Sequence, residues 1–398
     1  MRPLHLAVGL LFSWAFSGFA LHAPAAQPAL APEGGELVTE VVANNLVVPW
    51  ALAFTPDGRL FFNERVGRVR VIGGDGVLLP DPVITLDVVQ STTMESGLLG
   101  LAVDPDFANN HYLFVYYTYG PPLKNKVDRL IVDDKTNTAT IDVTIVDLIP
   151  GASIHDGGRI KFGPDNFLYI GTGDATCAAA QDLTSLGGKI LRVDRDGNGA
   201  PGNPFPEGPL VYTYGHRNVQ GLAWDQGGQL YNTEHGPTGD CGYGGSRDEV
   251  NIIYAPDDPR YTTGNYGWPL CAGQCGDPRW VDPIRLYFPE TAAPSGATFC
   301  VACPIARWDA SLFHTTMGFP GNAFARHLHR ILFDPLDGVT ILDEEILFRP
   351  TFGRLRDVIQ GPDGLLYFST SNRDGRASDI LGMPGHEDDD KIIRIRPQ

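Results

Sequence analysis

A histidine and an aspartate, His155 and Asp174, flank two β-rich runs in the middle of the chain. The runs Arg159–Phe162 and Phe167–Gly171 are joined by the turn sequence Gly163–Asn166, so we expect a hairpin whose open end brings the two polar residues together. A neutral histidine with a carboxylate behind it can take the proton of a hydroxyl group. A lone histidine at a strand end is more often structural, so a catalytic interpretation requires further polar residues at the same place.

Arginines and oxygen donors elsewhere in the sequence have the types that such a site would need. Arg217, Arg354 and Arg356 carry guanidinium forks, which a hydride acceptor bearing several carboxylates would require. The carbonyls of the bend Gly236–Pro237 and the acidic pair Asp248–Glu249 suit a hard cation such as Ca²⁺. The sequence has no Walker loop, no dinucleotide fingerprint in a βαβ context and no His-Glu-x-x-His motif, which argues against ATP and nicotinamide cofactors.

A recurring hairpin supplies the elements that must position these residues. Each copy is a strand, a turn related to x-Pro-Asp-Gly and a second strand rich in aromatic residues. The six copies predict an all-β, six-bladed β-propeller of four-stranded antiparallel blades, which we favour over a pair of sandwiches. Loops from all blades of a propeller meet at one axial mouth. The copies begin at Trp50, Leu99, Gly158, Gly221, Ser295 (a degenerate copy) and Arg356.

Composition and the two ends of the chain bear on partners and location. The 398 residues carry a formal charge of −17, which argues against nucleic acid or an anionic membrane as a partner. Residues 1–26 read as a secretory signal peptide rather than a membrane anchor, so we expect an exported protein, periplasmic or secreted, without a membrane span in the mature chain. We expect residues 34–398 to form one propeller domain, with the C-terminal DKIIRIRP pairing with the start of the mature chain.

Six cysteines follow the N-terminal segment. An even number in an exported protein favours disulfides, and the sequence alone leaves their pairing open. The motifs CAGQC and CVAC are each compatible with half of a zinc site, an alternative that export makes less favourable. No haem attachment motif is present, because CVAC is followed by proline, so electrons would leave to a separate acceptor. The cysteines are Cys177, Cys241, Cys271, Cys275, Cys300 and Cys303.

Seven motifs in order along the chain resemble those of the soluble quinoprotein glucose/sorbosone dehydrogenase family, and most closely its aldose sugar dehydrogenase branch. The match extends from about Leu46 to Arg396. The resemblance implies a six-bladed propeller that holds pyrroloquinoline quinone (PQQ) and Ca²⁺ at its axial mouth. The motifs are HDGGRIKFGPDNFLYIGTGD, LGGKILRVDRDGN, YGHRNVQGLAW, EHGP, DEVNII, NYGWP and GRLRDVIQGPDGLLYFST.

The resemblance also implies roles for the residues around the substrate. His155 matches the general base that removes the proton of the sugar C1 hydroxyl as hydride moves to the quinone, and Asp174 matches the acid that orients this histidine. Arg217 and Asn218 match residues that contact the quinone, and Arg217 can stabilise negative charge on the reduced cofactor. Glu95 lies where the family has a polar residue facing the sugar.

Further matches concern the cofactor carboxylates and calcium. Arg354 and Arg356 match arginines that bind the PQQ carboxylates. The carbonyls of Gly236 and Pro237 match ligands of the Ca²⁺ at the cofactor, which acts as a Lewis acid on the quinone carbonyl. Three residues match a second, structural calcium site: Asp248, Glu249 and Tyr266.

The chain departs from the family pattern at three places. Ile154 stands where the glucose-oxidising branch has an acid that touches the sugar. No lysine near Met317–Gly318 matches the one that this branch uses on PQQ. The insertion TGDCGYGGSR, between EHGP and DEVN, carries Cys241 at a place where it can reshape the mouth.

These matches lead us to expect a PQQ- and calcium-dependent enzyme that oxidises an aldose at C1 to the lactone and passes the electrons to an external acceptor. One alternative is a propeller without catalytic activity that binds a protein ligand, as animal members of the superfamily do, or a carbohydrate ligand. Such a binding propeller would not need the histidine, aspartate and arginines described above, so their joint presence argues against this alternative. Another is a calcium-dependent lactonase, which needs several carboxylate and amide ligands around one axial ion that the sequence does not supply.

Overall fold

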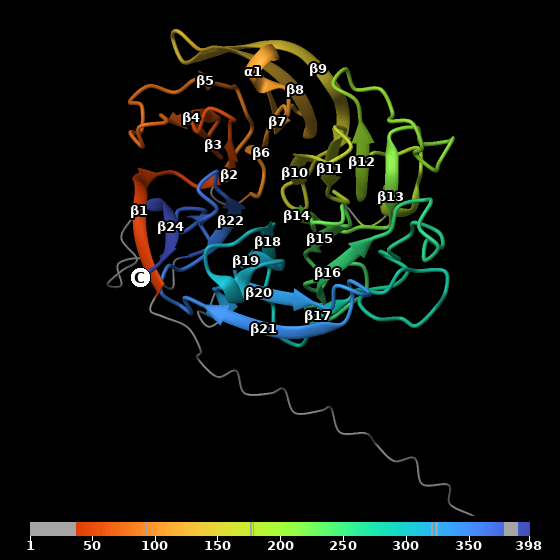
Figure 1. The fold of residues 1–398 in the computed structure, drawn as a ribbon. Helices are drawn as coiled ribbons and strands as arrows, with labels where there is room; N and C mark the ends of the chain where they lie inside the picture. The colour runs from red at the N-terminus through yellow and green to blue at the C-terminus, as the bar shows by residue number, and fades with distance from the viewer. Residues whose placement is uncertain are drawn as a thin grey trace, which may run out of the picture. The chain divides into compact units, whose positions relative to one another are not determined.

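The computed structural model describes residues 37–91, 94–175, 177, 179–319, 321–322, 325–377 and 389–398. These residues form six sheets of four antiparallel strands each, which confirms the predicted six-bladed propeller. Figure 1 shows the sheets arranged around a common centre. The predicted signal peptide, residues 1–26, lies outside the described residues.

Each blade is built from consecutive strands, except that the N-terminal strand joins the last blade. In order across each sheet, the strands are: blade 1, β2 (Pro49–Phe54), β3 (Leu60–Glu64), β4 (Arg68–Ile72), β5 (Ile84–Thr85); blade 2, β6 (Leu98–Val103), β7 (Tyr112–Tyr119), β8 (Lys124–Asp133), β9 (Thr138–Pro150); blade 3, β10 (Gly157–Phe162), β11 (Leu168–Thr172), β12 (Lys189–Val193), β13 (Val211–Tyr214). The remaining strands are: blade 4, β14 (Val219–Trp224), β15 (Leu230–Glu234), β16 (Asp248–Ile253), β17 (Arg285–Tyr287); blade 5, β18 (Pro294–Cys300), β19 (Ser311–Thr316), β20 (Leu328–Phe333), β21 (Ile341–Leu347); blade 6, β22 (Leu355–Gln360), β23 (Leu366–Thr370), β24 (Asp390–Pro397), β1 (Leu37–Leu46).

The helical segments among the described residues are short. They are α1 (Phe107–Asn110) and the 3₁₀ turns η1 (Ala179–Gln181) and η2 (Ala306–Trp308). No helix in the described part of the chain has the length and apolar character needed to cross a membrane.

The ring closes in two ways. The first strand of each blade contacts the first strand of the next, and β22 contacts β2 to complete the circle. In addition, β1 pairs antiparallel with β24, with Val38 opposite Arg396, so that the two ends of the described propeller share blade 6 (Figure 1). The predicted pairing of the C-terminal strand with the start of the mature chain is therefore confirmed.

The inner hairpins follow the predicted repeat. In blade 3, β10 and β11 are joined by the turn 163–166, in which Asn166 adopts a positive φ of 62° and the side chain of Asp165 accepts the N–H of Phe167. The second strand is completely buried: Leu168 and Ile170 face one side of the sheet, Tyr169 faces the other, and each side packs in an apolar cluster. The strand bounds predicted from the sequence differ from the observed bounds of β10 and β11 by no more than two residues.

A β-bulge recurs near the start of the first strand in every blade. The pairing with the second strand shifts register there, for example between Gly157 and Ile160 in blade 3 and between Val219 and Gly221 in blade 4. Bulges bend a strand and redirect side chains, and they are common beside functional sites. All six lie at the end of the hairpin opposite the turn, which is the end that carries the predicted site residues.

The six cysteines form three disulfides, so the zinc alternative for CAGQC and CVAC does not apply. Each of these two motifs is closed internally, by Cys271–Cys275 and Cys300–Cys303. The third bridge, Cys177–Cys241, joins residues 64 positions apart and connects the loop after β11 to the loop after β15.

Candidate active site

The histidine and aspartate singled out from the sequence lie side by side at the open end of the blade 3 hairpin. His155 precedes β10, Asp174 follows β11, and Nδ1 of His155 is 2.8 Å from Oδ1 of Asp174. Gly173 permits this approach, since a Cβ there would lie 1.7 Å from the carbonyl oxygen of His155. His155 has a φ of 60°, a left-handed conformation that a non-glycine residue adopts mainly where its surroundings impose it.

Two further donors fix the tautomer of His155. The indole N–H of Trp268 donates to Oδ2 of Asp174 at 2.7 Å, and Nη2 of Arg217 lies 2.7 Å from Nε2 of His155. A guanidinium group can only donate, so Nε2 must hold a lone pair and Nδ1 must hold the proton that is given to Asp174. We call this chain of contacts, Trp268–Asp174–His155–Arg217, the imidazole relay. It produces a neutral imidazole with Nε2 available as a base.

Arg217 and Asn218 come from the loop that leads into blade 4. The Arg217 guanidinium pairs with both carboxylate oxygens of Asp240, at 2.9 and 3.1 Å, and also donates to the carbonyl of His235. The side-chain oxygen of Asn218 accepts the N–H of Gly157, which ties blade 4 to blade 3. Nδ2 of Asn218 is buried, and neither of its N–H groups has a hydrogen-bond partner among the described residues.

Arg354 and Arg356 lie together at the start of blade 6. Arg354 donates to Asp374 at 2.9 Å and to the carbonyls of Met317 and Gly318. Arg356 lies 3.7 Å from the same carboxylate, and its buried Nε has no partner among the described residues. Burial lowers the pKa of Arg356 to about 9, with the charge of Asp374 opposing this shift and the charge of Arg354 adding to it.

Two adjoining cavities occupy this end of the propeller. The larger, of about 310 Å³, is lined by His155, Arg217 and Arg354, and it falls in the size range of ligand pockets. The smaller, of about 20 Å³, is lined by Arg356 among others. Arg376, from the loop after β23, lines both.

The walls of these cavities carry more positive than negative charge. Burial raises the pKa of Asp156 to about 7, so this carboxyl group carries only part of its charge at neutral pH, and burial also raises the pKa of Asp248. This basic interior contrasts with the formal charge of −17 of the chain and suits an anionic ligand. The lining arginines are Arg65, Arg217, Arg354, Arg356 and Arg376, and the lining acids are Glu95, Asp156, Asp248 and Asp374.

Glu95 reaches the larger cavity from the loop before β6. Its Oε1 accepts from Arg376 at 2.6 Å, and its Oε2 accepts the backbone N–H of His155 at 2.9 Å. Burial by itself would raise the pKa of Glu95, but the charge of Arg376 and its hydrogen bond favour the ionised form, and the pKa is lowered to about 2. Glu95 is therefore a charged hydrogen-bond acceptor beside the imidazole, while Ile154 offers only an apolar side chain to the same cavity.

Oxygen atoms that suit a cation lie on the opposite wall. Gly236 lines the larger cavity beside Asp248, whose carboxylate accepts the N–H groups of Gly236 and Ala293, each at 2.8 Å. A Cβ on Gly236 would lie 2.1 Å from the carbonyl oxygen of Arg247, so only glycine fits this bend. Pro237 follows it and is buried. Carbonyl and carboxylate oxygens of this kind are the donors that Ca²⁺ prefers.

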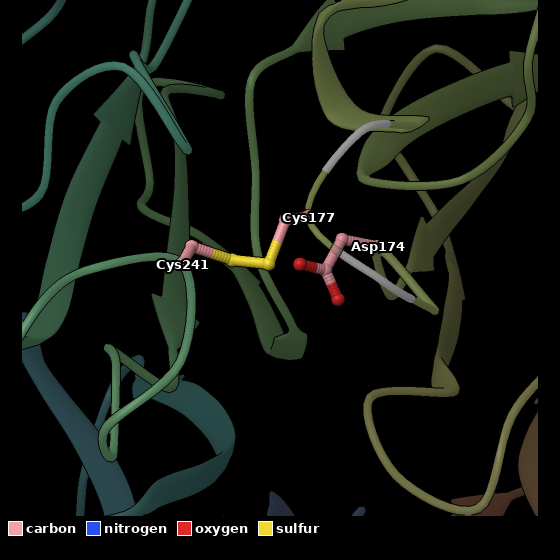
Figure 2. Close-up of side chains that lie close together, drawn as sticks. All are labelled: Asp174, Cys177 and Cys241. Carbon is pink, nitrogen blue, oxygen red and sulfur yellow. A yellow bond between two sulfur atoms is a disulfide. The ribbon is translucent and has the colours of Figure 1, made fainter.

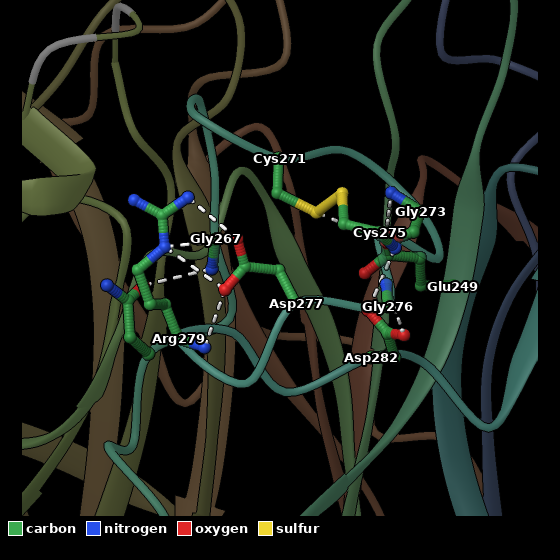
Figure 3. The surroundings of a disulfide bond; sticks show 10 residues. Glu249, Gly267, Cys271, Gly273, Cys275, Gly276, Asp277, Arg279 and Asp282 are labelled. Atoms are coloured by element: carbon green, nitrogen blue, oxygen red, sulfur yellow. Dashed lines mark hydrogen bonds and ion pairs between the residues drawn. A yellow bond between two sulfur atoms is a disulfide. The ribbon is translucent and has the colours of Figure 1, made fainter.

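The three side chains predicted for a second calcium site point to different partners. Asp248 and Glu249 are consecutive on β16, so their side chains leave opposite faces of the sheet. Glu249 accepts the N–H of Gly273, in the loop closed by the disulfide shown in Figure 3. The hydroxyl of Tyr266 donates to the carbonyl of Ile252. The structure does not bring these three side chains to one point, and their calcium role stays a prediction.

A profile of the glucose/sorbosone dehydrogenase family matches residues 46–381. The chain belongs to this family. The resemblance found in the sequence is thereby confirmed, and with it the oxidoreductase class.

Solved structures and curated relatives agree with this assignment. A Thermus thermophilus structure, provisionally named an oxidoreductase (glucose dehydrogenase), is 40% identical with a TM-score of 0.77 and covers 91% of this chain and 100% of that chain. The PQQ-bound form of the aldose sugar dehydrogenase from Streptomyces coelicolor is 33% identical with a TM-score of 0.73, over 91% and 99%. The aldose sugar dehydrogenase of Escherichia coli K12 is 28% identical over 84% of this chain and 90% of its own length.

Several site residues of this family member were not identified from the sequence. His235 and Arg376 line both cavities, and Asp374 lies between Arg354 and Arg356. His235 directly follows the second strand of an inner hairpin, and Asp374 and Arg376 lie in the loop after another such strand, so the repeat itself could have indicated them. Trp268 belongs to the motif NYGWP, which indicated its neighbourhood but not its contact with Asp174, and Asp240 lies in a long loop of blade 4 whose course only the fold determines.

Proposed function

We propose that this family member is an exported, PQQ- and calcium-dependent aldose sugar dehydrogenase that oxidises C1 of its substrate to the lactone and delivers the electrons to an external acceptor. One observation carries the proposal: the imidazole relay holds a neutral His155 at the wall of a cavity whose other walls are rich in buried guanidinium groups. The first feature fits removal of a hydroxyl proton, and the second fits an anionic cofactor.

The proton step is assigned to His155. Nε2 carries the lone pair and accepts the proton of the anomeric hydroxyl, while Nδ1 remains bonded to Asp174. The carboxylate of Asp174 stabilises the imidazolium that results, and Trp268 keeps that carboxylate in place. Arg217 must give up its contact with Nε2 as the substrate hydroxyl takes this position, and its guanidinium then lies beside the reacting atoms.

The residues at the mouth fit the cofactor by their chemistry. PQQ supplies the two-electron acceptor when it is bound. Arg354 and Arg356 would hold its carboxylates, since the buried Nε of Arg356 has no partner among the described residues, and Asn218 has a donor left in the same way. No lysine lines either cavity within the described residues, and Arg376 provides the additional cation.

The carbonyls of Gly236 and Pro237 would hold the Ca²⁺ beside the cofactor, with Asp248 close to Gly236. Glu95, charged and facing the cavity, would accept hydrogen bonds from sugar hydroxyls. Ile154 cannot accept them, so we expect a substrate preference that differs from that of glucose-oxidising relatives. The three disulfides are consistent with an oxidising compartment outside the cytoplasm.

The test is an absorbance titration of the purified protein with PQQ in the presence of Ca²⁺, followed by a panel of aldoses and alcohols with a dye as electron acceptor. We expect saturable PQQ binding, reduction of the dye with at least one aldose, and loss of dye reduction in His155→Ala with PQQ binding retained. Absence of PQQ binding would favour a propeller that only binds a partner. Hydrolysis of lactones without PQQ would favour the lactonase.

A further inference from the structure

Part of the loop between β15 and β16 contacts the imidazole relay, and its first residue, Thr238, lines the larger cavity. We call residues 238–243 the clamp loop; they belong to the insertion that departs from the family pattern. Cys241 in this loop is bonded to Cys177, which follows Asp174 by three residues. Figure 2 shows the disulfide directly beside the Asp174 carboxylate.

The clamp loop has three attachments, and each reaches the relay or the loop that carries it. Asp240 pairs with Arg217 through both carboxylate oxygens, at 2.9 and 3.1 Å. The ring of Tyr243 packs against the ring of Trp268, with centroids 5.7 Å apart. The third attachment is the disulfide.

These contacts connect the two carboxylates that orient the base. Asp174 holds Nδ1 of His155, and Asp240 holds the guanidinium that contacts Nε2. Asp174 and Asp240 come from different blades, and the bond Cys177–Cys241 joins the loops that carry them. The disulfide between the two loops therefore limits how far the Asp174 and Asp240 carboxylates, which act on opposite sides of the imidazole ring, can move apart.

The two sulfurs and the Asp174 carboxylate lie within 4.8 Å of one another, which is close enough to suggest a metal site. Both sulfurs are consumed in the disulfide and cannot act as thiolate ligands. The proximity is explained instead by a structural link to the relay.

We propose that the Cys177–Cys241 disulfide and Asp240 are a positioning device for catalysis: the disulfide anchors the clamp loop so that Asp240 keeps the Arg217 guanidinium beside the imidazole of His155, including after the substrate hydroxyl has replaced Arg217 at Nε2. This inference rests on the proposed function in so far as the relay is catalytic.

The anchor matters because Asp240 lies nearer to solvent than its partner. Its side chain is 26% exposed while that of Arg217 is 4% exposed, so water competes with Arg217 for the Asp240 carboxylate. The clamp loop also contains two glycines, Gly239 and Gly242, both at positive φ, which give it little stiffness. The disulfide restricts the positions that the loop can adopt and so keeps Asp240 in contact with Arg217. This matters because a displacement of about 1 Å near reacting groups can cost about 100-fold in rate.

The test compares two disulfide-free variants of the full chain. Cys177→Ala/Cys241→Ala removes the anchor, and Cys300→Ala/Cys303→Ala removes a local bridge in blade 5, away from the relay, as a matched control. For the PQQ- and Ca²⁺-loaded enzyme we expect kcat to fall about 10- to 100-fold in the first variant while KM for the sugar changes by less than about threefold. The control should keep the wild-type kcat.

A second readout does not depend on turnover. Side-chain ¹⁵N–¹H spectra of histidine-labelled protein without cofactor, with the His155 signals assigned through His155→Gln, report the bonding of both ring nitrogens. We expect the Nε2 signal of His155 to shift in Cys177→Ala/Cys241→Ala and in Asp240→Asn, and to be unchanged in the control. Asp240→Glu, which keeps the carboxylate, should recover most of the kcat lost in Asp240→Asn.

The proposal is overturned if the His155 signals of the anchor variant match those of the wild type, or if both disulfide variants lose the same fraction of kcat. It is also overturned if Asp240→Glu is as impaired as Asp240→Asn. If the wild-type protein oxidises no sugar with PQQ, the proposed function fails, whereas the spectra still decide whether the disulfide positions His155.

Discussion

The inner hairpins have a turn end and a mouth end, and the charged residues at these two ends have different roles. At the turn of blade 3, the carboxylate of Asp165 accepts from the hydroxyl of Tyr169 at 2.9 Å and from Nε of Arg192 at 2.8 Å. Tyr169 and Arg192 are direct cross-strand neighbours. Blade 6 repeats the arrangement with Asp363, Tyr367 and Arg394.

At the mouth the described residues show no such repeat. Blade 3 contributes His155 and Asp174, blade 4 contributes Arg217, and blade 6 contributes Arg354 and Arg356. The turns of blades 3 and 6 solve the same structural problem and are therefore alike. The mouth residues line shared cavities from different directions, so the blades supply different groups, and some buried donors have no partner among the described residues.

Matched aspartate variants at the two ends should differ most in kcat when the mouth variant changes Asp174 of the imidazole relay. Asp174 uses one carboxylate oxygen for Nδ1–H of His155 and the other for the indole N–H of Trp268. The amide in Asp174→Asn has only one oxygen and cannot replace both contacts, so the imidazole loses its orientation. We expect kcat for sugar oxidation to fall about 100- to 1,000-fold. Steady-state kinetics with PQQ and Ca²⁺ provide the measurement. Asp165→Asn, the matched change at the turn, should keep at least about half of the wild-type kcat; equal losses in both variants would remove the distinction.

The next largest effect should be on cofactor affinity. Arg356→Met removes a buried guanidinium with an unpartnered Nε, and a hydrogen bond to a charged group contributes about 1.5–3 kcal/mol. We expect the Kd for PQQ, measured by absorbance titration, to rise about 10- to 100-fold. Arg394→Met at the turn of blade 6 is the control, because its partners Asp363 and Tyr367 lie away from both cavities. PQQ affinity that is unchanged in Arg356→Met would show that this arginine does not hold the cofactor.

A third contrast concerns pH and the carboxyl group of Asp156 at the smaller cavity. Burial raises its pKa to about 7, above its ordinary value of 3.8, so its contribution to stability is full below about pH 4 and is lost as the pH rises through 7. Between pH 5 and pH 8 the Tm of the cofactor-free wild type should fall by at least about 2 °C more than that of Asp156→Asn. Thermal unfolding followed by circular dichroism measures this. Parallel Tm curves for the two proteins would contradict it.

The smallest effect should be at the turns themselves. Asp363 and Arg394 are 3.6 Å apart and both are about one-third exposed, and such pairs contribute at most about 1 kcal/mol. Asp363→Asn should therefore lower the Tm by no more than about 4 °C and leave kcat and PQQ affinity unchanged. A loss of PQQ affinity in this variant would mean that the two ends of the hairpin are coupled, against the comparison drawn above.

The fold followed from the sequence because its signals are local. Each inner hairpin carries its own turn, such as Gly163–Asn166, and its own buried second strand, such as Leu168–Thr172, so the repeat could be counted without knowing how the blades pack. The proximity of His155 and Asp174 was also predictable from local sequence, since a single hairpin connects these two residues. Motifs also indicated Arg217, Arg354 and Arg356, although not which residues they contact.

The sequence by itself therefore determined the propeller and the pair His155 and Asp174. Only the tertiary structure decided which nitrogen of His155 is the base, because that depends on Trp268 and Arg217 from other blades. It also decided the cysteine pairing and the role of Asp240, which lies in a long loop whose course no local pattern records. The physical reason is that hairpins are set by neighbours in the chain, whereas a site at the axis is set by how closed sheets place distant loops against one another.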